Sequence, residues 1–255
     1  MTSSGISLLS SVAMRAQPSE TAEMVSQLLF GDSFSVLQAN AGWLRIRTHS
    51  DDYEGWTSAN MVTLADEASP PPYPRKDWEK SHIVSRPLTV CRIMPDNVTV
   101  YLAGGSIFHE LPFRFAGKTY TLEEGATDIT GRDAVMLAEQ YLGAPYLWGG
   151  KTVFGIDCSG LVQVVCRMVG KSLPRDASQQ ANCGKPVAFE DVARGDLAFF
   201  SNEQGKVKHV GILCGDGSII HASGCVRKDS FDQKGILHST EKRYTHYLHS
   251  IRRLC

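Results

Sequence analysis

The sequence predicts an α+β fold, with two small all-β modules followed by a larger mixed domain. Short strand-like runs broken by turn residues occupy residues 6–64 and return over 82–122. Helix-like segments over 133–142 and from Cys158 to Gly170 come next, and further strand-like runs follow between residues 196 and 248. Helices first and an antiparallel sheet afterwards are the arrangement of an α+β domain.

The composition is that of an ordinary globular protein. The chain has 255 residues, of which 42% are hydrophobic and 21% charged, and a formal net charge of -1. This near-neutrality removes the electrostatic basis for nucleic-acid binding, and no run approaches the ~20 apolar residues that span a bilayer. Seven cysteines without a C-x-x-C pair argue for a reducing compartment. Because Met1–Ile6 lacks the features of a complete signal peptide, we expect a cytoplasmic protein, unless a leader has been trimmed.

Three segments precede the mixed domain. Residues 1–64 hold short, regularly spaced strand-like runs, which suggest a small barrel, and a turn at Gly55-Trp56 precedes the last of them. Residues 65–81 form a proline-rich linker, which is stiff and extended because proline restricts the backbone. Residues 82–125 return to the strand-like pattern, so a second, degenerate barrel is expected there. The mixed domain takes residues 126–255.

The mixed domain is organised around Cys158. The glycine-rich stretch Tyr146–Gly150 and the run Gly155–Gly160 precede apolar residues at helical spacing, so the cysteine enters the first turn of a helix that ends at Gly170. Asp157 supplies a capping oxygen for the free N–H groups there. The positive end of the helix dipole favours the thiolate, which is the nucleophilic form. For a lone cysteine, the simpler interpretation is a small buried hydrophobic residue.

A cysteine nucleophile needs a base, and the base needs an orienting partner. Only His209 and His221 lie in consecutive strand-like runs joined by a tight turn. Because strand faces alternate, the register decides whether the two imidazoles meet. A two-residue turn at Asp216-Gly217 puts them on opposite faces. A three-residue loop with Gly217 left-handed pairs Gly211 with His221 and makes the histidines diagonal neighbours, and we predict this loop.

A metal site is the other chemical interpretation of these residues. Cys158, His209 and His221 could hold a catalytic zinc ion, but neither the P-C-x-x-C nor the H-x-E context of the zinc deaminases occurs. We therefore expect no metal and no cofactor. Five further histidines are expected to be surface or core residues without a chemical role: His82, His109, His238, His246 and His249.

Five short motifs occur in order along the mixed domain. They are Tyr146-x-Trp148-Gly149-Gly150, Asp157–Val162, Arg194–Leu197, His209–Ile212 and Ile220–Ala222. Together they resemble the NlpC/P60 cysteine peptidases, which are papain-like cell-wall peptidases, over residues 128–255. The preceding modules resemble bacterial SH3-like domains, and this layout is similar to the γ-D-glutamyl-L-diamino acid endopeptidase branch of that family.

The resemblance implies a role for each residue that matches a motif. Cys158 is the nucleophile and His209 the base. His221 orients the base, and Tyr146 places its hydroxyl near the oxyanion. Substrate contacts, some of them to the ammonium group of a free N-terminal L-Ala, are implied for Asp157, Ser159, Asp176, Trp148, Glu23 and Tyr53. The family often has serine where Ala177 stands here, and a solvated Glu23 and a core Tyr53 are the open alternatives.

The implied reaction is hydrolysis of the γ-D-glutamyl–L-diamino acid bond of murein tri- and tetrapeptides with a free N-terminal L-Ala. It releases L-Ala-D-Glu during cell-wall peptide recycling, with meso-diaminopimelate and L-lysine both open as the diamino acid. The alternatives are a secreted hydrolase of intact peptidoglycan stem peptides, a papain-like amidase or acyltransferase, and a non-catalytic binding module. The murein peptide is the expected partner, and a monomer is the expected state.

Overall fold

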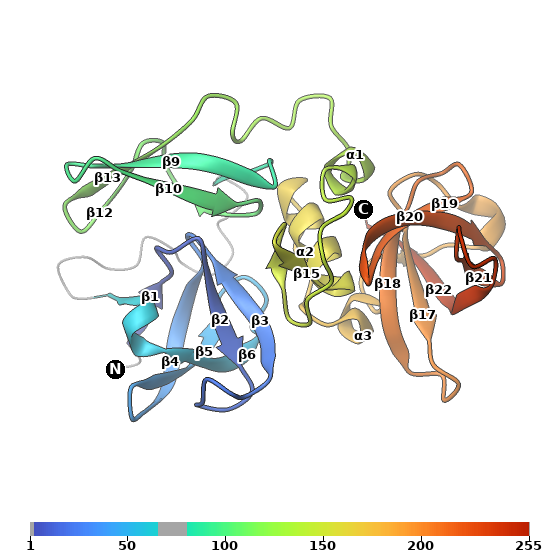
Figure 1. The fold of residues 1–255 in the computed structure, drawn as a ribbon, viewed down its shortest axis with the longest axis horizontal. Helices are drawn as coiled ribbons and strands as arrows, with labels where there is room; N and C mark the ends of the chain where they lie inside the picture. The colour runs from blue at the N-terminus through green and yellow to red at the C-terminus, as the bar shows by residue number, and fades with distance from the viewer. Residues whose placement is uncertain (1–2, 66–80, 255) are drawn as a thin grey trace. The chain divides into compact units, whose positions relative to one another are not determined.

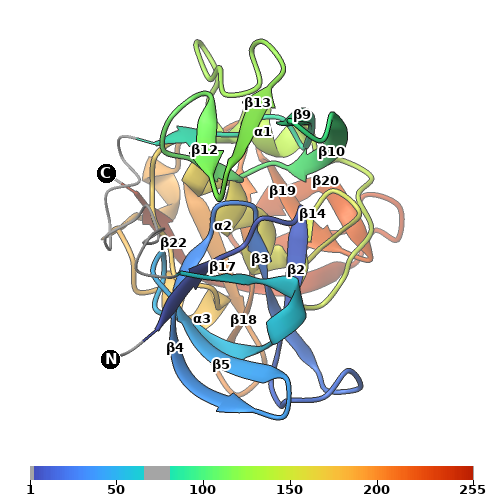
Figure 2. The ribbon, with the colours of Figure 1, turned by 90° about the vertical axis from the view of Figure 1, so that its left-hand side faces the viewer.

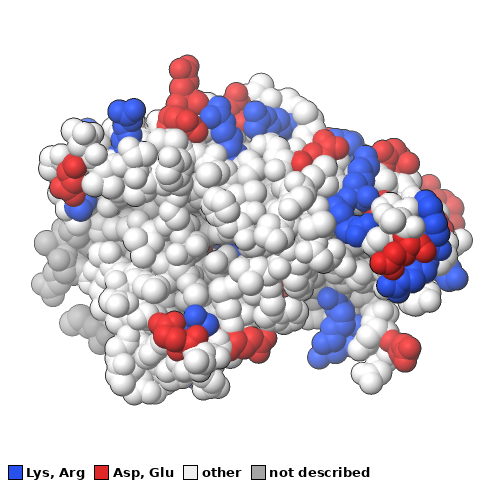
Figure 3. All heavy atoms as spheres, viewed as in Figure 1, with Lys and Arg blue, Asp and Glu red and all other residues white. Residues whose placement is uncertain are grey.

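The computed structural model describes residues 3–65 and 81–254, and its elements follow the predicted order of strands, helices and strands (Figure 1). Most of the predicted linker, residues 66–80, lies outside the described residues. Among the described residues, no helix combines the length and the hydropathy needed to cross a bilayer. Basic and acidic side chains are interspersed on the face drawn in Figure 3, in keeping with the small net charge.

The chain forms two compact units, and it enters each of them twice. The first unit holds residues 1–128 and 148–153, and the second holds residues 129–147 and 154–255. The chain therefore crosses between the units three times. The returning stretch, Trp148–Val153, belongs to the first unit although it lies between two parts of the second.

The amino-terminal sheet of the first unit is antiparallel, in the order β3-β2-β6-β5-β4-β1-β7 (Figures 1 and 2). Alternate side chains of its strands are buried, as strand geometry requires. They form a core from Val12, Met14, Leu28, Phe34, Leu44 and Ile46. Its elements are β1 (Ser4–Ile6), β2 (Ser11–Arg15), β3 (Met24–Leu29), β4 (Ser33–Asn40), β5 (Trp43–Thr48), β6 (Glu54–Ser58), the 3-10 helix η1 (Ala59–Met61) and β7 (Thr63–Leu64).

A second group of strands completes the first unit and shares a core with the amino-terminal sheet. Phe30 stacks on Phe108 at 4.8 Å between ring centroids and lies 5.3 Å from Tyr120. The domain limits at 64, 82 and 126 stay predictions. The strands are β8 (His82–Ile83), β9 (Leu88–Met94), β10 (Val98–Ala103), β11 (Ile107–Phe108), β12 (Phe113–Phe115) and β13 (Lys118–Leu122), in the sheet β10-β9-β13-β12 and the pair β11-β8.

The returning stretch is held against strand β3 and contains β14 (Lys151–Thr152). The Lys151 backbone N–H donates to Gln27 Oε1 at 2.7 Å, and the buried Lys151 ammonium lies 4.0 Å from the buried Asp32 carboxylate. Gly149 has φ +78°, and a Cβ there would lie 2.4 Å from the Met24 carbonyl oxygen. Because any larger side chain would collide with that backbone oxygen, this position requires glycine.

The second unit confirms the predicted α+β order. Strand β22 pairs with both β17 and β21, so strands β17 to β22 close into an antiparallel ring. The helices are α1 (Ala134–Glu139), α2 (Cys158–Met168), α3 (Ala177–Gln180) and the 3-10 helix η3 (Phe189–Asp191). The strands are β15 (Gly155–Ile156), β16 (Lys185–Pro186), β17 (Leu197–Ser201), β18 (Val207–Leu213), β19 (Ser218–Ser223), β20 (Cys225–Asp232), β21 (Gly235–Leu237) and β22 (Tyr244–Arg253).

Helix α2 begins and ends where the sequence predicts. The Asp157 carboxylate accepts a hydrogen bond from the Gly160 backbone N–H at 2.7 Å and so caps the first turn. Gly170 has φ +76°, the left-handed conformation that commonly follows a helix. The helix is buried along its length and packs against α1, β18 and β19. The residue at its first position, Cys158, is thereby held against the sheet.

Candidate active site

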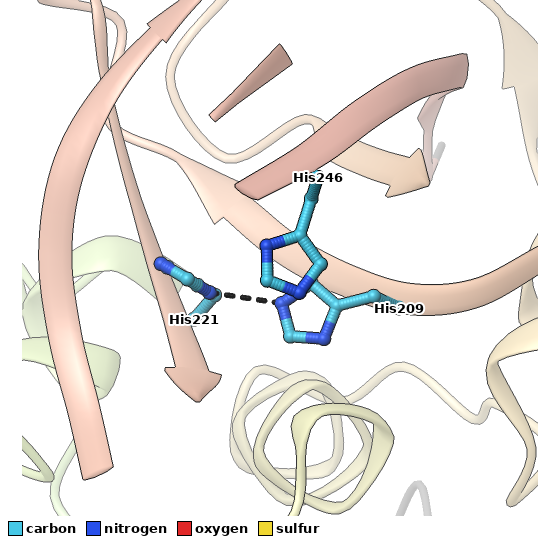
Figure 4. Close-up of side chains that lie close together, drawn as sticks. All are labelled: His209, His221 and His246. Carbon is cyan, nitrogen blue, oxygen red and sulfur yellow. Dashed lines mark hydrogen bonds between the residues drawn. The ribbon is translucent and has the colours of Figure 1, made fainter. Parts of the chain in front are cut away.

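The strand register brings the two predicted histidines together. Gly211 pairs with His221, and the Cys214 backbone N–H donates to the Ser218 carbonyl at 2.9 Å. Gly217, in the loop between them, has φ +77°. The predicted three-residue loop is therefore confirmed, and His209 Nε2 lies 2.8 Å from His221 Nδ1 (Figure 4).

The histidine pair continues to a buried carboxylate on the next strand. His221 Nε2 lies 3.1 Å from Asp229 Oδ2, and both side chains are buried. Strand β20, which carries Asp229, was not predicted, because the charged run Arg227-Lys228-Asp229 hides its strand character. The structure buries Val226, Asp229 and Phe231 and exposes positions between them. Because the buried positions are not evenly spaced and one of them is charged, the sequence gives only a weak strand pattern here.

Two donors hold the Asp229 carboxylate besides His221. The Ser239 backbone N–H donates to Oδ1 at 2.8 Å, and Arg227 Nη2 donates to the same oxygen at 3.1 Å. Burial alone would raise the pKa of Asp229, but the hydrogen bonds from His221, Ser239 and Arg227 outweigh it and lower the pKa below its ordinary value. Asp229 is therefore an anion throughout the neutral pH range.

Cys158 lies at the start of α2 with 6% of its surface exposed. Burial raises the pKa of its thiol to about 12, and the Asp157 carboxylate adds to the rise. Hydrogen bonds from the backbone N–H groups of Val210 and Ser159 act in the opposite direction. The helix position was predicted correctly, but the expected preference for thiolate was wrong, because loss of solvation outweighs the helix dipole. The Val210 contact also places the sulfur beside the backbone that follows His209.

His209 is a neutral imidazole, whereas the Cys158 thiol is protonated. Burial lowers its pKa well below the ordinary value, and the neighbouring His246 and His221 lower it further. A neutral imidazole is the form that accepts a proton. At neutral pH the pair is therefore a thiol and a neutral imidazole.

His246, for which no chemical role was expected, is a close neighbour of this pair. Its ring stacks on His209 at 4.1 Å between centroids, with 25° between the ring planes (Figure 4). Burial lowers the pKa of His246 to about 4, with a further contribution from His221. His246 therefore presents a neutral aromatic face to His209 and leaves the charge of the site unchanged at neutral pH.

The three imidazoles also lie close enough together to be considered as ligands of a metal ion. Their nitrogen atoms lie within 4.8 Å of one another, and imidazole is a ligand type that zinc accepts. However, His209 Nε2 and His221 Nδ1 already share a hydrogen bond, which an ion would have to displace. An active site without a metal stays our prediction.

Tyr146 lies within electrostatic reach of Cys158. Burial raises the pKa of its hydroxyl to about 12, and Cys158 and Asp157 contribute to the rise. The hydroxyl therefore keeps its proton and is available as a hydrogen-bond donor. A neutral donor within electrostatic reach of the sulfur is suited to stabilise negative charge that develops on an attacked carbonyl oxygen.

Arg175, which the sequence analysis did not single out, holds two of the predicted substrate-binding residues. Arg175 is 1% exposed, and its guanidinium donates to Asp157 Oδ2 at 2.6 Å, to Asp157 Oδ1 at 3.0 Å and to Ser159 Oγ at 2.8 Å. Asp157 and Ser159 are themselves buried. This bidentate pair fixes the first turn of α2, and the substrate roles of Asp157 and Ser159 stay predictions.

Arg175→Met is expected to lower the free energy of unfolding by about 3–5 kcal/mol, because it leaves the Asp157 carboxylate buried without its cation. Urea denaturation followed by circular dichroism measures the loss. Adding Asp157→Asn to Arg175→Met should restore part of the lost stability, and Arg45→Met, which removes an exposed pair with Glu54, should change it by less than about 1 kcal/mol. An Arg175→Met loss no larger than that of Arg45→Met would contradict the prediction.

The other residues predicted to bind substrate lie in three different environments. In the first unit, Trp148 Nε1–H donates to the exposed Glu23 carboxylate at 2.6 Å. Tyr53 packs against the core of the amino-terminal sheet, in line with the alternative of a core residue. Asp176, half-buried, precedes α3, and its backbone N–H donates to Gln179 Oε1 at 3.4 Å. Substrate contacts by these residues stay predictions.

The chain is similar to known proteins in both of its units. The profile of the NlpC/P60 family matches residues 143–249, and that of the bacterial dipeptidyl-peptidase SH3 domain matches residues 14–60. The γ-D-glutamyl-L-lysine dipeptidyl-peptidase of Bacillus subtilis (strain 168) is 31% identical over 216 residues, which cover 77% of this chain and 71% of that protein. A protein of the same name from Bacillus cereus is 27% identical over 229 residues, covering 78% and 67%.

A solved structure shares the fold. The crystal structure of an NlpC/P60 family protein from Bacillus cereus ATCC 10987 has a TM-score of 0.79 and 20% identity, covering 98% of this chain and 99% of that one. A cysteine at a helix start, packed against a sheet that carries two hydrogen-bonded histidines, is an arrangement that cysteine peptidases use. The chain belongs to the NlpC/P60 family.

Proposed function

We propose that the protein is a dipeptidyl-peptidase that hydrolyses the γ-D-glutamyl–L-diamino acid bond of murein peptides with a free N-terminal L-Ala. The extent of the sequence match carries this proposal. The similarity to the Bacillus subtilis dipeptidyl-peptidase covers 77% of the chain, whereas that to a probable endopeptidase of Corynebacterium glutamicum covers only 36%. The match to the dipeptidyl-peptidases therefore extends beyond the catalytic domain, and the dipeptidyl-peptidase SH3 profile matches residues 14–60.

The proposed reaction begins with proton transfer from the Cys158 thiol to neutral His209. The sulfur attacks the γ-glutamyl carbonyl carbon, and the oxyanion that forms accepts hydrogen bonds from the Tyr146 hydroxyl and from backbone N–H groups at the start of α2. Each such donor contributes about 3 kcal/mol to the stability of the transition state. His209 then protonates the leaving amine of the diamino acid, and a thioester to Cys158 remains.

Water completes the turnover. His209, again neutral, accepts a proton from the water that attacks the thioester carbonyl. The thiolate leaves and takes a proton back from His209, and L-Ala-D-Glu is released. The enzyme returns to its resting pair of thiol and imidazole, so no cofactor is consumed.

The free amine is the feature that we propose the enzyme selects. The Glu23 carboxylate is exposed and is oriented by the Trp148 indole. Trp148 is two residues from Tyr146 along the chain. The amine of a stem peptide attached to glycan is acylated, so the proposed substrates are soluble peptides. On this ground we propose a recycling role in the cytoplasm.

The test is turnover of L-Ala-γ-D-Glu-meso-diaminopimelate and its L-lysine analogue beside their N-acetylated forms, followed by mass spectrometry. We expect only the free-amine peptides to be cleaved. Glu23→Gln should raise KM for them about tenfold, because a charged hydrogen bond to the ammonium is lost.

Glu20→Gln, which changes an exposed carboxylate of the same turn region, is the matched control and should leave KM unchanged. Equal cleavage of acetylated and free peptides would remove the amine-binding proposal and keep the chemistry. Release of peptide fragments from intact sacculi would favour the wall-hydrolase alternative.

A further inference from the structure

Three adjacent strands each contribute one polar side chain to a diagonal row. Gly211 of β18 pairs with His221 of β19, and Ile219 of β19 pairs with Asp229 of β20. His209 and His221 are thus diagonal neighbours, and so are His221 and Asp229. The row ends at the carboxylate, 3.1 Å from His221 Nε2.

We propose that Asp229 is a positioning residue that sets the proton positions on both histidines of the site. A carboxylate only accepts hydrogen bonds, so His221 must carry its proton on Nε2. Neutral His221 then offers a bare Nδ1, and His209 must donate to it from Nε2. The lone pair of His209 is left on Nδ1, which is the nitrogen that takes the proton of Cys158. This inference rests on the proposed roles of Cys158 and His209, not on the identity of the substrate.

The Asp229 carboxylate has a permanently charged partner besides His221. Arg227 contacts both oxygens, with Nε 2.7 Å from Oδ2 and Nη2 3.1 Å from Oδ1, so the negative charge of Asp229 already has a cation beside it. A protonated His221 would donate from Nδ1 to His209 Nε2, which would place the proton of neutral His209 on Nδ1 and remove the base. The arrangement is therefore catalytically competent only with His221 neutral.

Asp229→Asn tests this assignment. Arg227 and the Ser239 N–H would keep the single amide oxygen as their acceptor, so the amide NH2 would face His221. His221 would then carry its proton on Nδ1, and His209 would lose its basic nitrogen. We expect kcat to fall about 10³- to 10⁴-fold, because holding a triad histidine in the wrong tautomer costs about 10⁴-fold, with KM changed less than about threefold. Asp232→Asn, on an exposed residue of the same strand, is the matched control and should change neither constant.

The tautomers are read directly by long-range 1H–15N correlation spectra of histidine-labelled protein. The wild type should show both His209 and His221 protonated on Nε2, and Asp229→Asn should move the His221 proton to Nδ1. A doubly protonated His221 in the wild type would overturn the proposal, and so would a loss of kcat in Asp229→Asn with the His221 tautomer unchanged. The wild-type spectrum decides the tautomers even if the variant does not fold. Because it needs no substrate, a wrong choice of peptide cannot imitate failure of this inference.

Discussion

Cys158→Ala is expected to lower kcat for the γ-D-glutamyl peptide by at least about 10⁴-fold, as removal of the nucleophile does in covalent hydrolases. No other described cysteine can replace it, because none is placed at the start of α2 beside the backbone of Val210. Mass-spectrometric detection of released L-Ala-D-Glu measures the loss. Circular dichroism establishes that the variant is folded.

Cys166→Ala is the matched control, since Cys166 is a buried cysteine of the same helix, and we expect its kcat to stay within about threefold. The raised pKa of Cys158, about 12, adds a second check. Because only the thiolate is alkylated, its reaction with iodoacetamide should rise about tenfold for each pH unit between 7 and 10. A kcat in Cys158→Ala close to that of the wild type would exclude the covalent mechanism.

His209→Ala is expected to lower kcat about 10³-fold, because a positioned general base contributes 10²–10⁴-fold. The thiol would then have to ionise without a base. Its pKa lies far above neutrality, so the residual rate should rise about tenfold per pH unit up to pH 10, whereas the wild type has its neutral base across this range. Steady-state kinetics from pH 6 to 10 measure both effects.

His246→Phe distinguishes the base from its neighbour. Phenylalanine keeps an aromatic ring against His209, where His246 stacks at 4.1 Å, but it has no nitrogen. We expect kcat within about fivefold of the wild type. A loss in His246→Phe equal to that in His209→Ala would mean that the base has been assigned to the wrong ring.

Local patterns were sufficient to place Cys158 at the start of a helix and to bring His209 and His221 together on one face of the sheet. The cap at Asp157 and the glycine at 170 define the two ends of α2 within a short stretch of sequence. The register of β18 and β19 follows from one turn, because the loop length and the left-handed Gly217 fix which residues pair. Each of these features depends on residues close together in the chain.

The features that the sequence did not reveal depend on distant residues. Arg175 meets Asp157 across 18 positions, and Asp229 joins the row only once β20 pairs with β19. Asp229 is one of several charged residues in β20, and its partners His221 and Ser239 belong to other segments. The sequence of β20 alone therefore does not show that this carboxylate is buried. The thiol pKa was misjudged for the same reason, since the helix dipole is a local effect and burial is created by the whole fold.

The returning stretch bears on how such an enzyme can evolve. Trp148–Val153 lies between Tyr146 and Cys158 in the sequence, yet its neighbours Met24, Gln27 and Asp32 are in the amino-terminal module. A peptidase gene separated from that module would leave the buried Lys151 without the side chains that surround it. The amino-terminal module therefore cannot be exchanged independently of the peptidase segment. Recombination that replaces the module must be accompanied by substitutions in Trp148–Val153.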